Sequence, residues 1–448
     1  MIGQTILTRA AALAAIPAVS ACGLLDVTNP NDLVEDDIRK IEAAAAVVNG
    51  TLILVSSSVS QSWQPYLVTA DELYWIGSRD SWLQLDKGFI DDPLNEFIDG
   101  PFPDMGQSRW MSDLAIEILT EHVANAETDA LKTAMAGHLA RANLYSGIIY
   151  TVIGEIQEDF AFSNKKEAGA PVGAGSMHTV LDKAIERLSA AVTSFQQLGN
   201  AGMAMNAVAV RARARHSRAI WDAINPSPSG NGLVNSAGAG TDAAAVIAAA
   251  GGNEADWLYN LTYSSASTTN SMASWVNDRK ENQVDLSIVT VNAANDIDGI
   301  ALKDPIDDVD DPSVIKWLNQ WKGGNHLDKG GVYPPLTLAS TRMMHIILAE
   351  NALAGGNESM FTEHINHIRA MDGLTPFSGQ ISSTDMLHHT RRVTVMLQGL
   401  RLADMYRWGL KDPKWEGPSD ATKCPGVMLP VSIIERRANQ QDWKDGCT

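Results

Sequence analysis

The pattern of apolar and polar residues along the chain is mainly that of amphipathic helices. In TVLDKAIERLSAAVTSFQQLG the apolar residues recur at steps of three and four positions, which places them on one helix face. They are Leu181, Ala184, Ile185, Leu188, Val192 and Phe195. Thr179 with Asp182 resembles a capping box, and Gly199 is a typical stop. The segment therefore predicts a helix with one buried face.

The same periodicity predicts further helices over 34–56, 106–124, 128–156, 203–224, 338–354, 358–371 and 384–409. Several are rich in alanine, as in TAMAGHLARANLYSG and AVAVRARARHSRAIWDA, and small side chains let neighbouring helices approach closely. We therefore predict helix hairpins stacked side by side, similar to tetratricopeptide units without their strict consensus. The expected fold class is mostly all-α, a tetratricopeptide-like helix-hairpin superhelix with a long irregular insert.

The periodic pattern weakens between residues 225 and 335. This segment begins with the Pro/Gly/Ser/Asn-rich stretch NPSPSGNGLVNSAGAGTD and continues rich in Asn, Asp, Thr and Trp. Long irregular segments inside helical proteins are uncommon unless they carry function. The mature chain is therefore divided into an N-terminal helical scaffold (22–224), an irregular insert forming the ligand-binding face (225–335) and a C-terminal helical scaffold (336–448).

Residues 1–21 have the layout of an export signal. Arg9 precedes the small and apolar run AAALAAIPAVSA, which is too short for a permanent transmembrane helix. The residues Val19-Ser20-Ala21-Cys22 resemble a bacterial lipobox, which predicts a lipoprotein acylated at Cys22; a secreted protein with a chance cysteine is the alternative. Each buried acyl methylene would contribute about 0.8 kcal/mol of membrane binding. No later apolar run is expected to span a membrane.

Charge and cysteine content narrow the choice of partners. The formal net charge is −19, which disfavours nucleic acid and anionic lipid as partners. Besides Cys22 the chain has Cys424 and Cys447, and an even pair in an exported protein predicts a disulfide, with two unpaired thiols as the alternative. No CxxC spacing indicates zinc or redox chemistry.

Several segments together resemble the SusD/RagB family of outer-membrane nutrient-uptake lipoproteins. TRMMHIILAENALAGGN is similar to the family's RAEA helix with its Gly-Asn turn, HINHIRAMDGL to iNxiRxRaGL, RRVTVMLQGLRLADMYRWG to ERRxEL…EGxRxxDLxRWG, and MLPVSIIERRAN to the closing PIPxxExxxN. CGLLDVTNPND is similar to the family's lipidated start. The segments keep the family's order over most of the mature chain. Three motif positions differ, because the family usually has Glu where this chain has Thr390, Val395 and Gln398.

The resemblance implies a scaffold of four tetratricopeptide-like hairpins with an irregular insert as its ligand face. It implies a lipid-anchored protein at the outer-membrane surface that captures an oligomeric nutrient, a glycan or in some members a peptide. The implied partner is a SusC-like TonB-dependent barrel that receives this ligand. No enzyme is expected, since no GxSxG motif or placed carboxylate pair is found. A peptide- or protein-binding tetratricopeptide-type lipoprotein and a helical glycoside hydrolase or lyase stay open as alternatives.

Aromatic residues are the candidate ligand contacts. A sugar ring binds with its C–H face flat against Trp or Tyr, while Asn, Asp and Gln bond its hydroxyls. Such residues gather in the non-periodic stretch ADELYWIGSRDSW and in two stretches of the insert, DWLYNLTY and NSMASWVNDRKENQ. The candidates are Tyr74, Trp75, Asp80, Trp82, Trp257, Tyr259, Tyr263, Trp275, Asn277 and Asp278. We expect a subset of them to form a sugar-binding platform.

Arg401, Asp404 and Arg407 recur at three-residue steps, so their charges share one face of the predicted helix. We interpret them as a partly buried salt-bridge network that ties this helix to its neighbours. A binding site for an anionic substrate is the alternative.

Neither a metal nor another cofactor is expected. His364 and His367 form an H-x-x-H pair, which would bind zinc with His388 and His389 only if their helices met. DIDGIALKDPIDDVDDP carries seven carboxylates, at Asp296, Asp298, Asp304, Asp307, Asp308, Asp310 and Asp311. It fails the EF-hand template, so a solvated acidic loop is predicted, with an irregular structural calcium site as the alternative.

Overall fold

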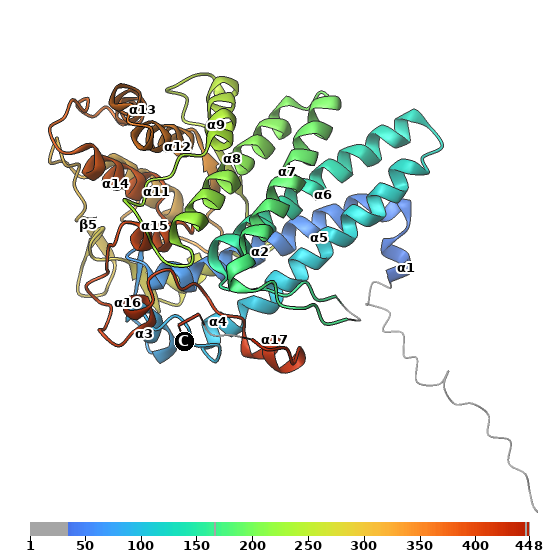
Figure 1. Cartoon of the computed structure of the whole chain (residues 1–448), viewed down its shortest axis with the longest axis horizontal. Coiled ribbons are helices and arrows are strands. Elements are labelled where there is room, and N and C mark those ends of the chain that lie inside the picture. Colours follow the sequence, from blue (N-terminus) through green and yellow to red (C-terminus); the bar gives the residue numbers. More distant parts are fainter. Residues whose placement is uncertain (1–34, 165–166, 444–445, 448) are drawn as a thin grey trace, which may run out of the picture.

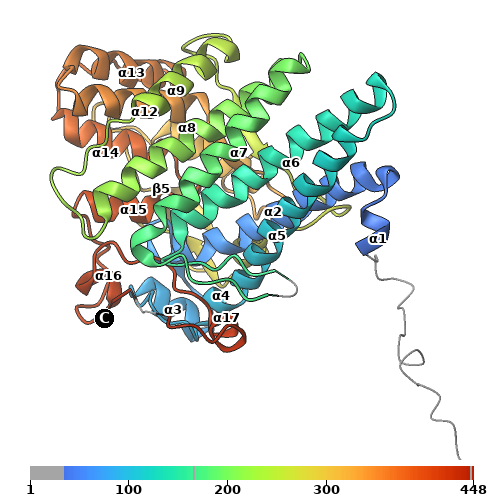
Figure 2. The same ribbon diagram turned by 45° about the vertical axis from the view of Figure 1, so that its right-hand side comes forward.

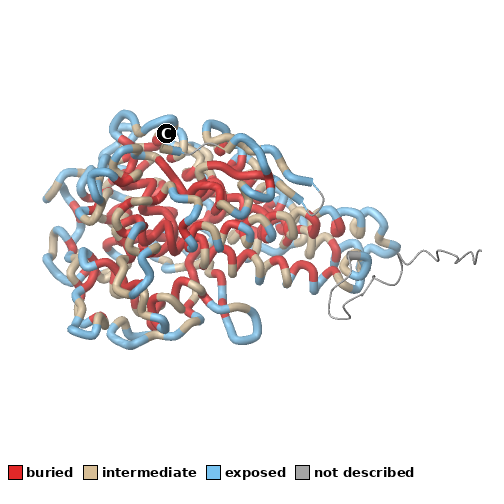
Figure 3. The backbone as a smooth tube through the Cα atoms, turned by 90° about the horizontal axis from the view of Figure 1, so that it is seen from below, coloured by how far each residue is buried: buried red, intermediate tan, exposed pale blue. Residues whose placement is uncertain are grey.

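The computed structural model of the protein describes residues 35–164, 167–443 and 446–447. The export signal and the predicted lipidation site Cys22 lie outside the described residues. Figure 1 shows long helices packed side by side, with shorter helices and loops gathered at one end. Figure 3 shows the buried backbone concentrated in the middle of the molecule, with exposed residues mainly in the peripheral loops.

The described part of the chain is an array of antiparallel helices in which sequence neighbours pack together. α5 packs on α6, α6 on α7, α7 on α8 and α8 on α9; α9 then contacts α12, and α12 contacts α13. The long helices are α2 (Ala44–Thr69), α5 (Pro101–Ala124), α6 (Asp129–Ile156), α7 (His178–Gln197), α8 (Ala201–Ile224), α9 (Ala237–Ala250), α11 (Pro312–Lys322), α12 (Thr341–Ala354), α13 (Glu358–Met371) and α14 (Ser383–Thr394). This arrangement confirms the predicted mostly helical fold of stacked hairpins.

Shorter elements complete the fold. The short helices are α1 (Glu35–Ile38), α3 (Asp80–Asp86), α4 (Glu96–Asp99), α10 (Ser271–Ala273), α15 (Arg401–Arg407), α16 (Asp420–Lys423) and α17 (Ile433–Ala438). The strands are β1 (Leu73–Trp75), β2 (Leu258–Leu261), β3 (Asn282–Val284), β4 (Val289–Val291), β5 (Ile297–Ile300) and β6 (Leu336–Ser340). They form three two-stranded antiparallel sheets, β1–β3, β2–β6 and β4–β5. None is large enough to form a core of its own.

Polar side chains define where several helices begin. The side chains of Thr128, Asn200, Ser340 and Asn357 each accept a hydrogen bond from a backbone N–H of the first turn that follows. These groups would otherwise lack partners at a helix N-terminus. α7 is different: it begins at His178 after Met177, without a side-chain cap, and Thr179 lies inside the helix. The predicted capping box is therefore wrong, although the helix and its end near Gly199 are as predicted.

The predicted helix over 384–409 is two helices. α14 ends at Thr394 and α15 begins at Arg401, and between them Leu397 and Gly399 have φ angles of 60° and 71°. The Leu397 N–H donates to Glu72 Oε1 over 3.1 Å. A Cβ atom on Gly399 would lie 2.6 Å from Trp63 Nε1. Tertiary contacts therefore break a helix that periodicity alone makes continuous.

Two glycines let α6 and α7 approach closely. A Cβ atom on Gly147 would lie 2.4 Å from Leu188 Cγ, and one on Gly154 would lie 2.6 Å from Leu181 Cγ. Both leucines belong to the apolar face of α7 and are fully buried. Glycine is therefore required here for packing, as the small residues of this segment indicate.

The segment 225–335 is less irregular than expected. It contains α9, which packs on α8 and α12, and α11, whose start is capped by Asp311. α9 thus continues the helical stack. The loops and short strands after residue 250 make up the remaining irregular part, and they include the candidate stretches around Trp257 and Trp275.

Residues Ile41–Thr69 are long and apolar enough to cross a membrane, contrary to the expectation from the sequence. Half of the most apolar window is buried inside the protein. α2 lies against α5 and α6, and Val48, Val55 and Val59 are fully buried. This packing gives an apolar helix a place in the core.

Arg401 belongs to one buried set of ion pairs, and Asp404 and Arg407 belong to a second, larger network. Arg401 pairs with Asp71 (Nε–Oδ1 2.6 Å), while Asp404 receives hydrogen bonds from Arg407 and Arg391. Arg407 also pairs with Glu350 on α12. Burial alone would raise the pKa of Glu350, but Arg407 and the bond from His216 hold it well below its usual range. The network joins α15 to α12 and α14.

The C-terminal segment returns to the loops around α3 and α4. Backbone hydrogen bonds join Glu416 to Lys87 and Ala421 to Gly88. Cys424 and Cys447 form a disulfide, and the Cys447 N–H donates to Asp91 Oδ2 over 2.9 Å. In Figure 2, α3, α4, α16 and α17 lie together at the lower edge of the molecule.

Candidate ligand-binding pocket

Three aromatic rings, two from the consecutive helices α3 and α4 and one from the insert, meet beside α2. Trp82 stacks on Phe97 with 3.6 Å between ring centroids and an interplanar angle of 7°. Trp275 stands edge-on to both rings, 5.7 Å from Trp82 and 5.2 Å from Phe97. Trp82 is almost fully buried, whereas Trp275 is half-buried. We call these three residues the aromatic cluster.

Local capping positions each ring. Trp82 lies on α3 and Phe97 on α4, and Asn95 joins them because it accepts a hydrogen bond from Phe97 N and donates to Ser81 O. Trp275 lies on the π-helical turn Ser274–Asp278 that follows α10. Asn270 caps α10 through the Ala273 N–H and donates to Pro334 O. Each aromatic residue thus lies on a short element held by a buried asparagine.

The aromatic cluster lines a cavity of about 230 Å³. Its walls are Gln61, Gln64, Trp82, Glu96, Phe97, Gly100, Pro101, Ser271 and Trp275. This is smaller than the roughly 300–1,000 Å³ of sites that enclose a drug-sized molecule. The cavity therefore suits one ring or the end of a longer ligand, with an apolar surface and a few amide and carboxylate groups around it.

Two arginines place positive charge at this pocket. The Arg279 guanidinium lies 4.4 Å from the centre of the Trp275 ring, and that of Arg79 lies 5.5 Å from it. Arg79 also forms a salt bridge with Glu96 (3.1 Å). Such cation–π contacts orient an aromatic ring. Trp275 is thus held in place while part of its surface borders the cavity.

The overall structure is similar to known structures. A SusD superfamily protein from Bacteroides thetaiotaomicron VPI-5482 aligns with a TM-score of 0.64 at 13% identity, covering 90% of this chain and 98% of the other. A SusD homolog from the same organism aligns with a TM-score of 0.61 at 11% identity, over 92% and 99% of the two chains. The protein has a SusD-like fold.

A third SusD-like structure is described by its ligand. A laminarin binding SusD-like protein aligns with a TM-score of 0.53 at 14% identity, over 89% of this chain and 98% of the other. No family model and no curated protein matches the sequence. At this level of identity the likeness concerns the SusD-like fold.

Within this SusD-like fold, two of the ten candidate ligand residues, Trp82 and Trp275, line the pocket. Tyr74 and Trp75 lie half-buried on β1 and pair with Gln283 and Asn282 of β3. Asp80 and Asp278 are exposed. They stand at the first residue of α3 and the last residue of the π-helical turn.

Other candidates serve packing. Tyr263 is 7% exposed and donates its hydroxyl to Ser56 O over 2.8 Å. Asn277 is buried, donates to Gly331 O and accepts from Lys322 Nζ (2.7 Å). These groups already have partners, so they are not free to bond a ligand.

Trp257 and Tyr259 lie away from the cavity walls. Trp257 packs against the apolar cluster of α8, α9 and α12, and its carbonyl accepts from Thr341 N (3.1 Å). Tyr259 is half-buried on β2, paired with Ala339 of β6. Burial raises the pKa of its phenol above the usual range.

Seven of the nine wall residues were not among those predicted from the sequence: Gln61, Gln64, Glu96, Phe97, Gly100, Pro101 and Ser271. Gln61 and Gln64 stand three positions apart in the serine-rich half of α2, and Phe97 lies in the Pro/Gly-rich stretch NEFIDGPFPD. Most polar residues of α2 are buried, among them Ser58, Ser60 and Ser62, so the polar pattern of this helix does not distinguish the two glutamines that border the cavity.

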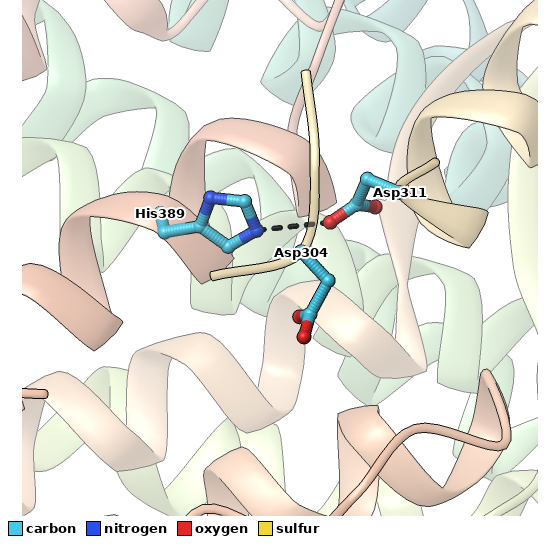
Figure 4. A group of neighbouring side chains, drawn as sticks. All are labelled: Asp304, Asp311 and His389. Atoms are coloured by element: carbon cyan, nitrogen blue, oxygen red, sulfur yellow. Dashed lines mark hydrogen bonds and ion pairs between the residues drawn. The ribbon is translucent and has the colours of Figure 1, made fainter. Parts of the chain in front are cut away.

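A cluster of Asp304, Asp311 and His389 has ligand atoms within 4.8 Å of one another (Figure 4). However, Asp304 accepts from Arg369 Nη1 and Nη2 (2.7 and 3.0 Å). Asp311 caps α11 through Ser313 N and accepts from His389 Nε2 (2.9 Å). These bonds join the acidic loop to α13 and α14, so the cluster already has protein partners in place of a cation.

Proposed function

We propose that this protein is an outer-membrane surface lipoprotein that binds an oligomeric glycan and delivers it to a SusC-like TonB-dependent barrel. The observation that carries this proposal is the aromatic cluster at a cavity bordered by amides and a carboxylate, on a SusD-like fold. Trp82 and Trp275 were chosen from the sequence as sugar-stacking residues, and they line the same cavity.

The chemistry of the pocket suits a sugar. The C–H face of a pyranose ring stacks on an aromatic surface, and its hydroxyls bond side chains such as Gln61 and Glu96 at the wall. Each aromatic contact contributes about 1 kcal/mol, and with a few hydrogen bonds a total of about 4 kcal/mol corresponds to a dissociation constant of about 1 mM. Such affinity allows capture and later release. No step of this role requires catalysis.

Delivery is proposed from the N-terminus and the fold. The lipobox-like residues before Cys22 would place the protein on a membrane without a spanning segment. The similar structures include one described as a carbohydrate binding protein, from Bacteroides vulgatus ATCC 8482, besides the laminarin-binding protein. Together with the fold, these descriptions support a glycan as ligand and the capture part of an uptake system as the role.

Calorimetric titration with a panel of oligosaccharides, laminarin oligomers among them, tests the proposal. We expect one or more glycans to bind and Trp275→Ala to weaken that binding about tenfold, because a stacking surface is lost. Trp257→Ala is the matched control, since Trp257 packs against α8, α9 and α12 outside the cavity. Melting curves of both variants report their folding.

Three outcomes count against the proposal. If Trp257→Ala weakens binding as much as Trp275→Ala while both variants stay folded, the pocket is wrong. If no glycan binds but peptides do, the peptide-binding alternative is favoured. Release of reducing ends or unsaturated products during the titration would instead indicate an enzyme.

A further inference from the structure

Three histidines meet between α12 and α13, away from the aromatic cluster. His345 lies on α12, and His364 and His367 lie on α13, which packs against it (Figure 2). His345 Nδ1 and His364 Nδ1 are 3.2 Å apart. The His345 ring centre is 5.4 Å from that of His364 and 5.0 Å from that of His367. The H-x-x-H pair is thus completed by His345, whereas His388 stacks on Trp408 and His389 bonds Asp311.

A backbone carbonyl fixes the tautomer of His345. His345 Nε2 lies 2.9 Å from Asn253 O, in the loop after α9. A carbonyl oxygen only accepts, so Nε2 carries the proton and Nδ1 presents a lone pair toward His364. Histidines that bind metals are commonly oriented by such a carbonyl on the other nitrogen.

The spacing of the imidazoles matches metal coordination. Two nitrogens bound tetrahedrally at roughly 2.0–2.1 Å from zinc lie about 3.3 Å apart, and three such rings have centres about 5 Å apart. The His345–His364 nitrogen distance is 3.2 Å, and the third ring pair, His364–His367, is 6.3 Å apart. His367 Nε2 makes no hydrogen bond among the described residues, and Glu363 Oε1 lies 3.9 Å from it, so this nitrogen can become a ligand.

We propose that His345, His364 and His367 bind a divalent cation of the zinc class, which fastens α13 to α12. In the metal-free protein His364 Nδ1 donates its hydrogen to the lone pair of His345 Nδ1, 3.2 Å away. When the cation binds, the His364 ring takes its Nε2–H tautomer, and the two Nδ1 atoms become ligands. His367 turns about its side-chain torsions to become the third ligand, because in the described residues these rings do not yet bring one nitrogen each within 4.8 Å. The proposal concerns a structural site and does not depend on the proposed glycan binding.

The surroundings allow a cation to enter. His345 is fully buried, but His364 and His367 are half-buried and face the surface. Glu363, whose side chain is 63% exposed, lies with Oε1 3.9 Å from His367 Nε2. A carboxylate at the entrance attracts cations. A fourth coordination position is left for water or for Glu363.

The test uses the mature chain with a purification tag that contains no histidine, freed of metal with a chelator. We expect Co²⁺ to bind with one equivalent per chain and to give the absorption of tetrahedral cobalt, and Zn²⁺ to displace it and raise the melting temperature. His364→Gln should weaken Zn²⁺ binding at least tenfold, and His367→Gln should weaken it less. His122→Gln, on α5, is the matched control and should bind as the unaltered chain does.

The metal-free melting curves decide between loss of the site and loss of the fold. If His364→Gln melts as the unaltered chain does and still binds Zn²⁺ with the same affinity, the proposal is wrong. It is equally overturned if the unaltered chain binds no Co²⁺ or Zn²⁺ at millimolar concentration. If His364→Gln melts early without metal, the comparison is made with His367→Gln, and an unchanged affinity of that variant overturns the proposal as well.

Discussion

The pKa values of the adjacent residues Asp71 and Glu72 are shifted in opposite directions. Burial would raise the pKa of Asp71, but the ion pairs with Arg401 and Arg392 lower it to about 2. Glu72 is fully buried, and its Oε2 atom has no hydrogen-bond partner among the described residues. Burial, helped by the charge of Asp71, raises the pKa of Glu72 to about 8. The two residues thus differ because only one of them contacts guanidinium groups.

Replacing Glu72 should make this difference measurable. An unfolded glutamate releases its proton near pH 4.5, whereas folded Glu72 keeps it up to about pH 8. The unaltered protein therefore loses stability as pH rises through this window, by up to about 1.4 kcal/mol per pH unit. The glutamine in Glu72→Gln does not titrate. The free energy of unfolding of this variant, relative to that of the unaltered protein, should therefore increase from pH 5 to pH 8. Urea unfolding at each pH measures it.

Asp71→Asn tests the coupling between the two groups. Asp71 is itself ionised throughout pH 5 to pH 8, but its charge helps to raise the pKa of Glu72, so the variant should lose less stability than the unaltered protein as pH rises over this range. If the difference in free energy of unfolding between Glu72→Gln and the unaltered protein does not change from pH 5 to pH 8, Glu72 is ionised in the folded protein.

At the scale of elements, the close contact between α6 and α7 depends on glycines, which have no side chain. Gly147 and Gly154 face Leu188 and Leu181 at distances that leave no room for a methyl group. Gly137, on the same helix, has nothing within 4 Å of the position where a Cβ atom would lie. In α6, packing against α7 therefore requires Gly147 and Gly154 to be glycine, but it does not require this of Gly137.

Alanine substitution separates these two kinds of glycine. Gly147→Ala should destabilise the protein by about 1–3 kcal/mol, because the added methyl forces Leu188 and the backbone to move. Gly137→Ala should stabilise it by about 0.5–1 kcal/mol through helix propensity. Thermal unfolding of both variants under one condition provides the comparison. Equal shifts of the same sign would mean that α6 and α7 are not packed as described.

At the scale of the whole molecule, the two ends of the chain have different roles in the proposed function: the C-terminal end supports the pocket, and the N-terminal end is the proposed membrane anchor. The C-terminal segment holds the pocket loops through the bonds to Lys87, Gly88 and Asp91 and through the Cys424–Cys447 disulfide. The N-terminal residue of the mature chain is predicted to be Cys22, which lies outside the described residues. Pocket and anchor are thus separate parts of the chain.

Detergent extraction from native membranes tests the proposed anchor and partner together. We expect the mature protein to stay with the membrane fraction and to be purified with a large β-barrel protein. Cys22→Ala should release it to the soluble fraction, because no acyl chains remain to be buried. Mutant protein that stays as firmly bound as the unaltered protein would contradict lipid anchoring, and repeated recovery without a barrel would contradict the delivery role.

The sequence by itself determined the helices and their stacking, because a 3.6-residue apolar period and small residues are local properties that survive in almost any packing. It also indicated the disulfide and two members of the aromatic cluster, Trp82 and Trp275. It did not reveal Phe97, the burial of Tyr263 and Asn277, or the break at Gly399.

Those features depend on which distant segment lies opposite each residue. Trp63 faces Gly399, Ser56 accepts from Tyr263, and Asn95 holds Phe97 beside Trp82. Only the tertiary structure decided these pairings, and with them which aromatic rings border a cavity and which histidines meet. An aromatic or polar side chain has the same appearance in a sequence whether its partner is the core or a ligand, and packing alone makes that choice.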